Sequence, residues 1–227
     1  MRIAVLGLYN SGSSVLAGML HRLGVHMAPP FWGDFYEPYE LSWHLRNWWN
    51  EPHLCESTAP EHRVCFLRHW IELQESTAEG YVGAKHPLLS LCGPDLLAAW
   101  GADVRFIWSY RSLEDSIRGL KRRNWFPGHE DRVQRHLWDA LEAFERSHVA
   151  LFKIDWLRVK ANPQRGAREL AQAAGLEPTD AQLDAAAGIV RPSAAAHRRA
   201  VRLGRRLYSS VRASLTPITG ARPLRRI

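Results

Sequence analysis

The chain has 227 residues, 46% of them hydrophobic, and a formal net charge of +7. This length suffices for one α/β domain with a substantial core. No apolar run approaches the roughly 20 residues of a membrane-spanning helix, and we expect no signal peptide because residues 1–8 are typical of a strand. The three cysteines (Cys55, Cys65 and Cys92) are odd in number and form no C-x-x-C motif, so a reducing, cytoplasmic location is expected.

The positive charge is concentrated at the C-terminal end. Residues 191–227 contain ten arginines and no acidic residue, which leaves 20 basic against 23 acidic residues in 1–190. We therefore predict a domain over 1–192 and an Arg-rich, helical tail over 193–227 that could contact an anionic surface. The simpler interpretation is a solvated face. The chain has no recognisable nucleic-acid-binding module, so no nucleic-acid partner is expected.

The first predicted element is a buried strand over residues 2–8, followed by a glycine- and serine-rich loop, GLYNSGSS, at 7–14. Gly7 and Gly12 have the spacing of a phosphate-binding P-loop, G-x-x-x-x-G-K-[ST], with Ser13 in place of the lysine. Apolar residues then recur at helical spacing up to Leu23. A strand, a glycine loop and a helix N-terminus together predict an anion site. The alternative is a serine-rich turn.

An aromatic stretch follows between Phe31 and Trp70. It holds five of the ten tryptophans: Trp32, Trp43, Trp48, Trp49 and Trp70. Such a stretch suits a wall for a sugar or another ring-bearing acceptor, although core packing would explain many of these residues. A zinc quartet of His53, Cys55, His62 and Cys65 would have an unfamiliar ligand spacing.

Three further strands are predicted at 81–85, 104–110 and 149–154, each followed by a helix-compatible stretch. Alternating strands and helices predict a three-layer α/β/α fold with a central parallel sheet, like that of the P-loop NTPases. Ligands of such sheets gather beyond the carboxyl ends of the strands. At these ends the sequence places the loop 7–14, Lys85 with His86, and Arg111.

A small-molecule kinase is disfavoured by two absences in the sequence. Ser13 stands where a P-loop kinase needs its phosphate-binding lysine. No acidic residue ends the strand at 104–110, because Asp103 precedes it and Tyr110 and Arg111 close it.

Several segments, in this order, resemble the sulfotransferases that use 3′-phosphoadenosine 5′-phosphosulfate (PAPS), especially the bacterial branch. Residues 7–16 resemble the family's G-x-x-R-S-G-T-S-x-L loop, and GAKHPLL (83–89) resembles its lysine-x-proline strand end. FIWSYRSLEDSIRGLKRRNW (106–125) is similar to the strand whose terminal arginine holds the 3′-phosphate, and 151–176 resembles the late strand, N-P turn and helix. The likeness covers most of 1–192.

The resemblance implies transfer of a sulfuryl group from PAPS to a hydroxyl or amine of a small-molecule or carbohydrate acceptor, with no metal required. It implies that Lys85 neutralises the sulfuryl group, although a lysine extending from a strand end into solvent is the alternative. His86 is our first candidate for the general base and Glu37 the second, and His86 could instead be a core histidine. Residues expected at the nucleotide are Gly7, Asn10, Ser11, Gly12, Ser13, Ser14, Arg111, Ser116 and Gly119.

The sequence departs from the family pattern at three positions. Asn10 replaces the usual cation beside the phosphosulfate, Gly119 replaces the serine that binds the 3′-phosphate, and Leu113 replaces a frequent proline. Ser112 or Ser116 could supply a hydroxyl instead. A catalytically weakened, nucleotide-binding relative is therefore the alternative function.

Overall fold

The central sheet has four parallel strands: β1 (Arg2–Gly7), β2 (Val82–Lys85), β3 (Arg105–Tyr110) and β4 (Leu151–Asp155). The computed structural model describes residues 1–147 and 150–190, so the predicted tail lies outside the described residues. The strand order is β2-β1-β3-β4, with every pair parallel. All four predicted strands are confirmed. Since β1 is central, the loop that follows it opens between the ends of β2 and β3.

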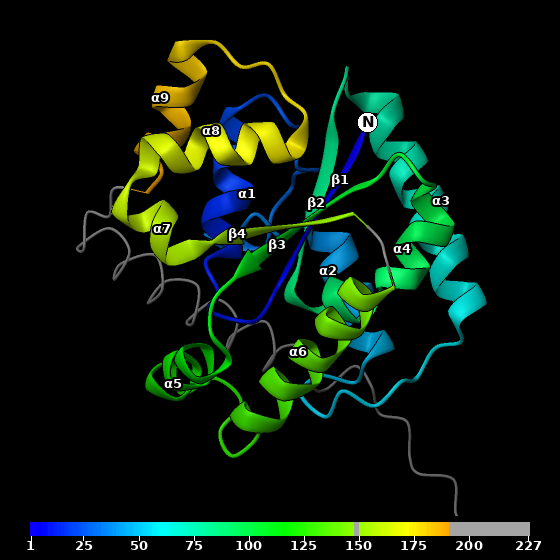
Figure 1. The fold of residues 1–227 in the computed structure, drawn as a ribbon. Coiled ribbons are helices and arrows are strands. Elements are labelled where there is room, and N and C mark those ends of the chain that lie inside the picture. Colours follow the sequence, from blue (N-terminus) through cyan, green and yellow to red (C-terminus); the bar gives the residue numbers. More distant parts are fainter. Residues whose placement is uncertain (148–149, 191–227) are drawn as a thin grey trace, which may run out of the picture. The chain divides into compact units, whose positions relative to one another are not determined.

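Helices cover both faces of this sheet (Figure 1). Successive residues of β1 point to opposite faces: Ile3 and Val5 pack with α1 (Ser13–Arg22), α8 (Pro163–Ala174) and α9 (Asp180–Gly188). Ala4 and Leu6 pack with α3 (Pro60–Thr77), α4 (Gly93–Trp100) and α6 (Glu130–Arg146). The two separate apolar clusters give the predicted three-layer α/β/α fold.

Local signals set the ends of several helices. Ser112 accepts a hydrogen bond from the Asp115 amide and starts α5 (Leu113–Arg123), which ends at Asn124 with φ 52°. Asp155 caps α7 (Trp156–Ala161) directly after β4. Asn162 caps α8, whose first residue is Pro163. A side-chain oxygen at each N-cap satisfies an amide that the first helical turn leaves without a partner.

The segment between α1 and α3 is less regular than the elements around it. It contains the short 3₁₀ helix η1 (Gly33–Phe35) and α2 (Tyr39–Trp48) before α3 begins. A second 3₁₀ helix, η2 (Pro87–Leu91), follows β2.

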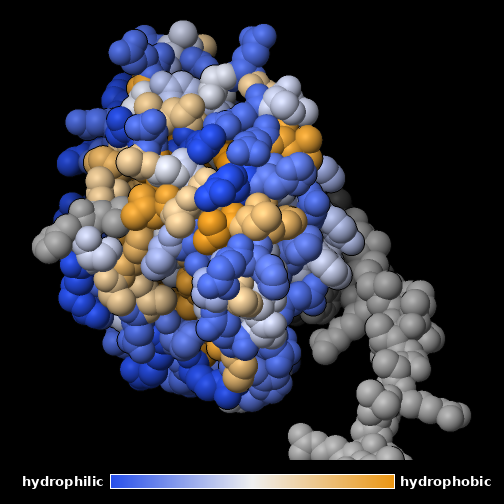
Figure 2. Space-filling model, turned by 90° about the vertical axis from the view of Figure 1, so that its right-hand side faces the viewer, coloured by the Kyte–Doolittle hydropathy of each residue, from blue (hydrophilic) through white to orange (hydrophobic). Residues whose placement is uncertain are grey.

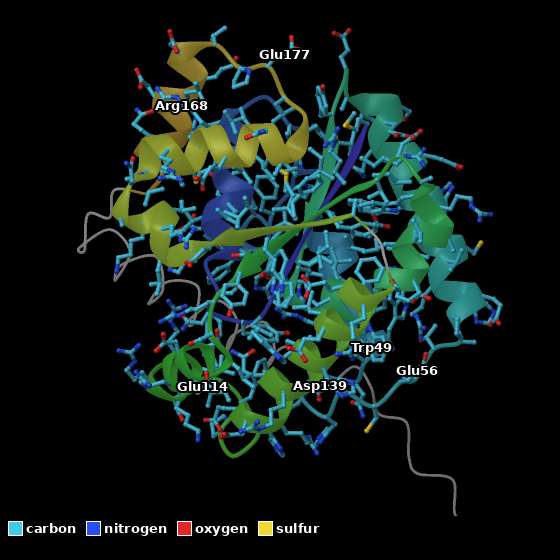
Figure 3. The ribbon with its side chains drawn as sticks, in the orientation of Figure 1. Trp49, Glu56, Glu114, Asp139, Arg168 and Glu177 are labelled. Carbon is cyan, nitrogen blue, oxygen red and sulfur yellow. The ribbon has the colours of Figure 1, made fainter. Side chains whose placement is uncertain are left out.

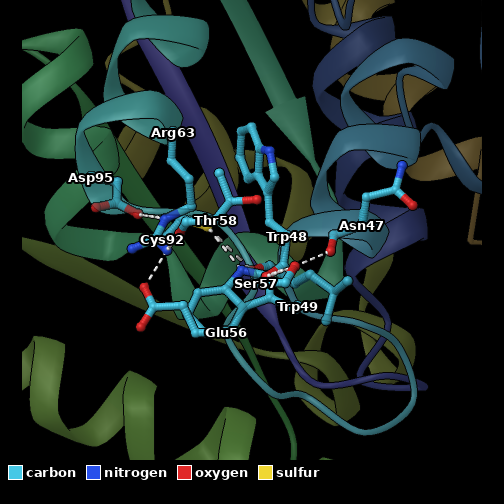
Figure 4. A network of polar contacts seen from close by, with 10 residues as sticks. Asn47, Trp48, Trp49, Glu56, Ser57, Thr58, Arg63, Cys92 and Asp95 are labelled. Carbon is cyan, nitrogen blue, oxygen red and sulfur yellow. Dashed lines mark hydrogen bonds and ion pairs between the residues drawn. The ribbon is translucent and has the colours of Figure 1, made fainter. Parts of the chain in front are cut away.

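A buried arginine fixes the connection between α2 and α3. Arg63 donates from Nε to Asp95 Oδ2 at 2.6 Å and from a terminal nitrogen to the Thr58 carbonyl at 2.6 Å, and it also pairs with Glu56 (Figure 4). The Ser57 amide and hydroxyl both bond the Trp48 carbonyl. These bonds close the chain after α2, so α2 is held in place at its C-terminal end.

The described surface is mostly hydrophilic. The face on the right of Figure 1, where α3 and α4 lie, carries apolar side chains in a band between hydrophilic ones (Figure 2). Glu114, Asp139, Arg168 and Glu177 are exposed on the outer surface, whereas Trp49 is buried (Figure 3). Within residues 1–147 and 150–190, no helix is long and apolar enough to cross a membrane.

Candidate active site

The glycine loop lies between the end of β1 and the start of α1. Gly7 has φ 153° and Gly12, the N-cap of α1, has φ 94°. A Cβ at Gly7 would lie 2.7 Å from Ser11 Oγ, and one at Gly12 would lie 2.6 Å from Trp156 Cγ. Asn10 occupies the left-handed region at φ 61°, which asparagine tolerates better than most residues. Both glycines are therefore required by crowding and by backbone conformation.

Side chains from neighbouring elements bind the backbone of this loop. Ser90 Oγ accepts from the Gly7 amide at 2.9 Å, and the Gln134 side chain bonds both the amide and the carbonyl of Tyr9. Ser109 Oγ donates to the Ser11 carbonyl at 3.0 Å, and Arg111 donates to the Asn10 carbonyl at 2.9 Å. These bonds hold the loop rigidly from several sides.

The loop leaves amide donors available at the N-terminus of α1. The first-turn amides of a helix have no intrahelical acceptor, and the amides of Gly12, Ser13 and Ser14 bond no other described residue. The Ser11 hydroxyl oxygen is buried and likewise has no partner among the described residues. Unsatisfied donors at a helix N-terminus form a site suited to an anion such as a phosphate.

Lys85 lies beside this loop at the end of β2 and is only 2% exposed. Its Nζ donates to Ser14 Oγ at 2.9 Å, to Glu37 Oε1 at 2.6 Å and to the Phe35 carbonyl at 3.4 Å. Lys85 therefore joins the phosphate loop to the irregular segment that carries Glu37. The alternative of a lysine extending into solvent does not describe this arrangement.

Glu37 and Lys85 form a buried ion pair. Burial alone would raise the pKa of the Glu37 carboxyl, but the charge of Lys85 above all, with that of Arg46, lowers it below its usual value. Burial also lowers the pKa of the Lys85 ammonium group, and the Glu37 carboxylate opposes that shift. The carboxylate of Glu37 is thus ionised at neutral pH.

His86 lies next to the same carboxylate, with Nε2 3.8 Å from Glu37 Oε2. Burial lowers the pKa of His86 to about 3, so the ring is neutral near pH 7. Nδ1 accepts a hydrogen bond from the Leu88 amide at 3.1 Å, which assigns the ring proton to Nε2. The ring therefore has no free lone pair, because Nδ1 is engaged and Nε2 is protonated.

A second polar cluster adjoins Glu37. Arg46 of α2 pairs with Glu51 at 3.3 Å and lies 5.0 Å from the centre of the Trp32 ring. Glu51 accepts a hydrogen bond from the Tyr9 hydroxyl, directly behind the loop. Burial raises the pKa of Glu51, while Arg46 and the Tyr9 hydroxyl oppose this. This cluster adds positive charge close to Glu37 and His86.

The carboxyl end of β3 contributes Arg111 and the start of α5. Arg111 Nε and Ser116 Oγ are buried and have no hydrogen-bond partner among the described residues. Gly119, one helical turn after Ser116, is in contact with Asn10: a Cβ at Gly119 would lie 2.8 Å from Asn10 Cγ. Arg111 Nε and Ser116 Oγ are thus polar groups that could bind a ligand at this end of the sheet.

Comparison with known proteins assigns the fold. No family model matches the chain, and no curated protein matches it. Solved structures do match: the sulfotransferase STF9 from Mycobacterium avium has a TM-score of 0.60 at 13% identity, covering 82% of this chain and 66% of that one. The sulfotransferase STF1 from Mycobacterium tuberculosis has a TM-score of 0.52 at 16% identity, with 82% and 70% covered.

A third structure, the sulfotransferase domain from the curacin biosynthetic pathway, has a TM-score of 0.54 at 16% identity, covering 81% of this chain and 76% of that domain. The chain has the sulfotransferase fold. This confirms the fold that the sequence motifs predicted, and it places the loop, Lys85 and Arg111 at the carboxyl ends of three adjacent strands of that fold.

The structure brings the predicted catalytic residues together. Lys85, His86 and Glu37 form one buried cluster. The glycine loop lies beside them through Ser14. Arg111 and Gly119 instead contact Asn10 at the end of β3, and Ser116 lies one turn before Gly119 on α5. Ser112 Oγ accepts from the Asp115 amide as the N-cap of α5, which leaves its O–H able to donate.

Sequence reasoning missed the residues that support the loop, namely Ser90, Ser109 and Gln134, and also Arg46 and Glu51. Gln134 carried a usable signal, because it lies among the buried positions of α6 where an apolar residue would be ordinary. The tryptophans of the aromatic stretch differ in burial: Trp48, Trp49 and Trp70 are buried, while Trp43 is 56% exposed. Among residues 1–147 and 150–190, no three His, Cys, Asp or Glu side chains are grouped to hold a metal, including the considered zinc quartet.

Proposed function

We propose that the protein is a sulfotransferase that moves a sulfuryl group from PAPS to a hydroxyl or amine of a small-molecule or carbohydrate acceptor. The observation that carries this proposal is the buried cluster in which Lys85 bonds both Ser14 of the phosphate loop and Glu37. It puts a cation and a carboxylate side by side at the mouth of an anion site, within a sulfotransferase fold.

The residues around the loop fit a nucleotide with two phosphates. The free amides at the start of α1, with the hydroxyls of Ser13 and Ser14, would hold the 5′-phosphate end. Arg111, whose Nε has no partner among the described residues, would hold the 3′-phosphate. Bound PAPS would supply the sulfuryl group, and its products would be the sulfated acceptor and adenosine 3′,5′-bisphosphate.

We assign Lys85 the role of stabilising charge at the site of transfer. Charge builds up on the leaving phosphate as the sulfur–oxygen bond to it breaks and the bond to the acceptor oxygen forms. A buried ammonium group held by Ser14 and Glu37 is already oriented and costs little reorganisation. Asn10 offers no charge of its own, so Lys85 carries this role for the loop.

We assign the general base to Glu37 rather than to His86. The Glu37 carboxylate is ionised, and its Oε2 is not bonded by Lys85, which donates to Oε1. It could accept the proton that the acceptor hydroxyl releases as its oxygen bonds to sulfur. His86, with Nδ1 bonded by the Leu88 amide, would be a neutral neighbour of Glu37, its Nε2 3.8 Å from Oε2.

The first test is nucleotide binding, measured as a shift in melting temperature. Adenosine 3′,5′-bisphosphate should raise it, because a ligand that binds only the native state stabilises by about 2.7 kcal/mol at a hundredfold excess over Kd. ATP with Mg²⁺ should have little effect. A larger shift with ATP and Mg²⁺ would contradict the proposal and favour a kinase.

The second test is turnover of PAPS with a panel of phenols, aliphatic alcohols, amines and sugars, followed as release of adenosine 3′,5′-bisphosphate. Glu37→Gln keeps the size of the side chain and should lower kcat about 100-fold or more. Neutral Asn10 and the pairing of Lys85 with Glu37 favour one alternative, a nucleotide-binding relative without turnover. That alternative would be supported if the protein binds adenosine 3′,5′-bisphosphate but does not release it from PAPS with any acceptor of the panel.

A further inference from the structure

Two departures from the sulfotransferase pattern, at positions 10 and 119, are in contact with each other. They lie 109 residues apart in the sequence, one in the phosphate loop and one in α5. A Cβ at Gly119 would meet the Asn10 amide: its three nearest atoms would be Nδ2, then Cγ at 2.8 Å and Oδ1 at 3.5 Å. The Asn10 side chain therefore occupies the space that a side chain at position 119 would fill.

The Asn10 amide is free to donate at this place. Neither Nδ2 nor Oδ1 bonds another described residue, and the side chain is only half-buried. Its backbone is fixed, because the Asn10 carbonyl accepts a hydrogen bond from Arg111 at 2.9 Å. The Asn10 side-chain amide therefore lies where a side chain at position 119 would begin.

Independent observations indicate a ligand at this place. The neighbouring Arg111 Nε and Ser116 Oγ are buried without partners among the described residues, and Ser116 is 0% exposed. Arg111 bonds the Asn10 carbonyl, and Ser116 lies one turn before Gly119 on α5, so these donors belong to the elements that adjoin the Asn10 amide. An anion with several acceptor oxygens would satisfy more than one of them.

We propose that Asn10 binds the 3′-phosphate of the nucleotide through its side-chain amide, in place of a side chain at position 119. The inference rests on the proposed function, because it takes the nucleotide to be 3′-phosphorylated. It makes Gly119 a necessary partner of Asn10, since any larger residue there would displace the amide. The two departures compensate each other and do not both weaken the site.

The experiment compares Kd values for adenosine 3′,5′-bisphosphate and adenosine 5′-phosphate, measured by calorimetry on the full chain. Asn10→Gly removes the amide and accommodates φ 61° without strain. We expect it to weaken bisphosphate binding about tenfold or more, the effect of losing a hydrogen bond to a charged group. The Kd for adenosine 5′-phosphate should change by less than about twofold, since this nucleotide lacks the contacted phosphate.

A matched pair of double variants makes the test specific. With the Asn10 side chain gone, position 119 has room for a Cβ, because all three nearest atoms belonged to Asn10. Asn10→Gly with Gly119→Ser restores a donor and should return the bisphosphate Kd to within about threefold of the original. Asn10→Gly with Gly119→Ala differs by one hydroxyl and should stay weak. Melting temperatures without nucleotide verify folding of each variant.

The outcomes separate the two proposals. If the unaltered protein does not prefer the bisphosphate over adenosine 5′-phosphate, the proposed function is wrong. If it does prefer the bisphosphate, but Asn10→Gly weakens both nucleotides equally or neither, the role of Asn10 is wrong. That role is also wrong if serine and alanine at position 119 give the same bisphosphate Kd in the Asn10→Gly background.

Discussion

The phosphate loop (residues 7–14) and the Glu37 segment (residues 31–39) form the two sides of the candidate site and are held in different ways. The loop is bonded from outside by Ser90, Ser109, Gln134 and Arg111. The Glu37 segment closes on itself, with the Trp32 amide bonded to the Glu37 carbonyl at 2.7 Å. Stacking of Trp32 on Tyr39, with ring centres 5.1 Å apart, supports the same closure.

Lys85 connects these two regions, because it bonds Ser14 of the loop and both Phe35 and Glu37 of the segment. From this contrast we infer different roles for the two regions. A loop bonded on several sides suits a constant ligand such as the proposed nucleotide, whereas the Glu37 segment rests on α1 through Phe31 and Tyr36 and on Lys85. The four predictions below test this comparison, beginning with the residue that joins the regions.

The largest effect is expected from Lys85→Met. It leaves the Glu37 carboxylate buried without its partner, which typically costs about 3–5 kcal/mol in the free energy of unfolding. Urea denaturation at pH 7 would measure the loss. The double variant Lys85→Met with Glu37→Gln removes the unpaired charge and should recover most of it. Equal stability of the single and double variants would show that the ion pair does not hold the segment.

The second-largest effect is expected in the pH dependence of the free energy of unfolding, caused by titration of His86. The pKa of His86 is about 3 in the folded chain and about 6.5 when unfolded, so between these values the unfolded state binds the additional proton. Stability therefore falls as pH falls, by ~2–3 kcal/mol between pH 7 and pH 4.5. Urea denaturation across this range would measure the slope.

His86→Asn is the matched control for that slope. Its side-chain oxygen can still accept from the Leu88 amide, but it does not titrate. The variant should therefore have a flatter dependence of unfolding free energy on pH. Keeping the pH at or above 4.5 limits the contribution of Glu37, whose lowered pKa makes it lose stability only at more acidic pH. An unchanged slope in His86→Asn would assign the pH dependence to other groups.

Arg111→Ala tests the loop side of the comparison. The guanidinium can form paired, charge-assisted hydrogen bonds with a phosphate, so its loss should weaken adenosine 3′,5′-bisphosphate binding by about 2–3 kcal/mol. Binding of adenosine 5′-phosphate should change much less. Calorimetry with both nucleotides measures the difference. Equal losses for the two would mean that the 3′-phosphate lies elsewhere.

The smallest effect on stability is expected from Trp43→Ala on the acceptor side. Trp43 is 56% exposed, so the free energy of unfolding should change by less than about 0.5 kcal/mol. On the hypothesis that the aromatic stretch forms the acceptor wall, KM for a ring-bearing acceptor should rise while the Kd for the bisphosphate stays constant. A parallel rise in both constants would remove the distinction between the two regions.

The sequence by itself determined the sheet and the loop, because both are encoded locally. Strand 2–8 and the other three predicted strands are short apolar runs, and the spacing of Gly7 and Gly12 between a strand and a helix is typical of a phosphate-binding loop. Parallel strands also put Lys85 and Arg111 at one edge of the sheet. The positions of these residues follow from strand ends alone.

Only the tertiary structure determined which residues of the site contact one another and how they are protonated. The pairing of Lys85 with Glu37 joins residues 48 positions apart, and it depends on the path of an irregular segment that no periodicity describes. The neutral state of His86 follows from burial and from the Leu88 amide. Asn10 and Gly119, which both depart from the sulfotransferase pattern, lie far apart in the sequence but are in contact in the fold. Such effects depend on distance in space, which local sequence patterns do not contain.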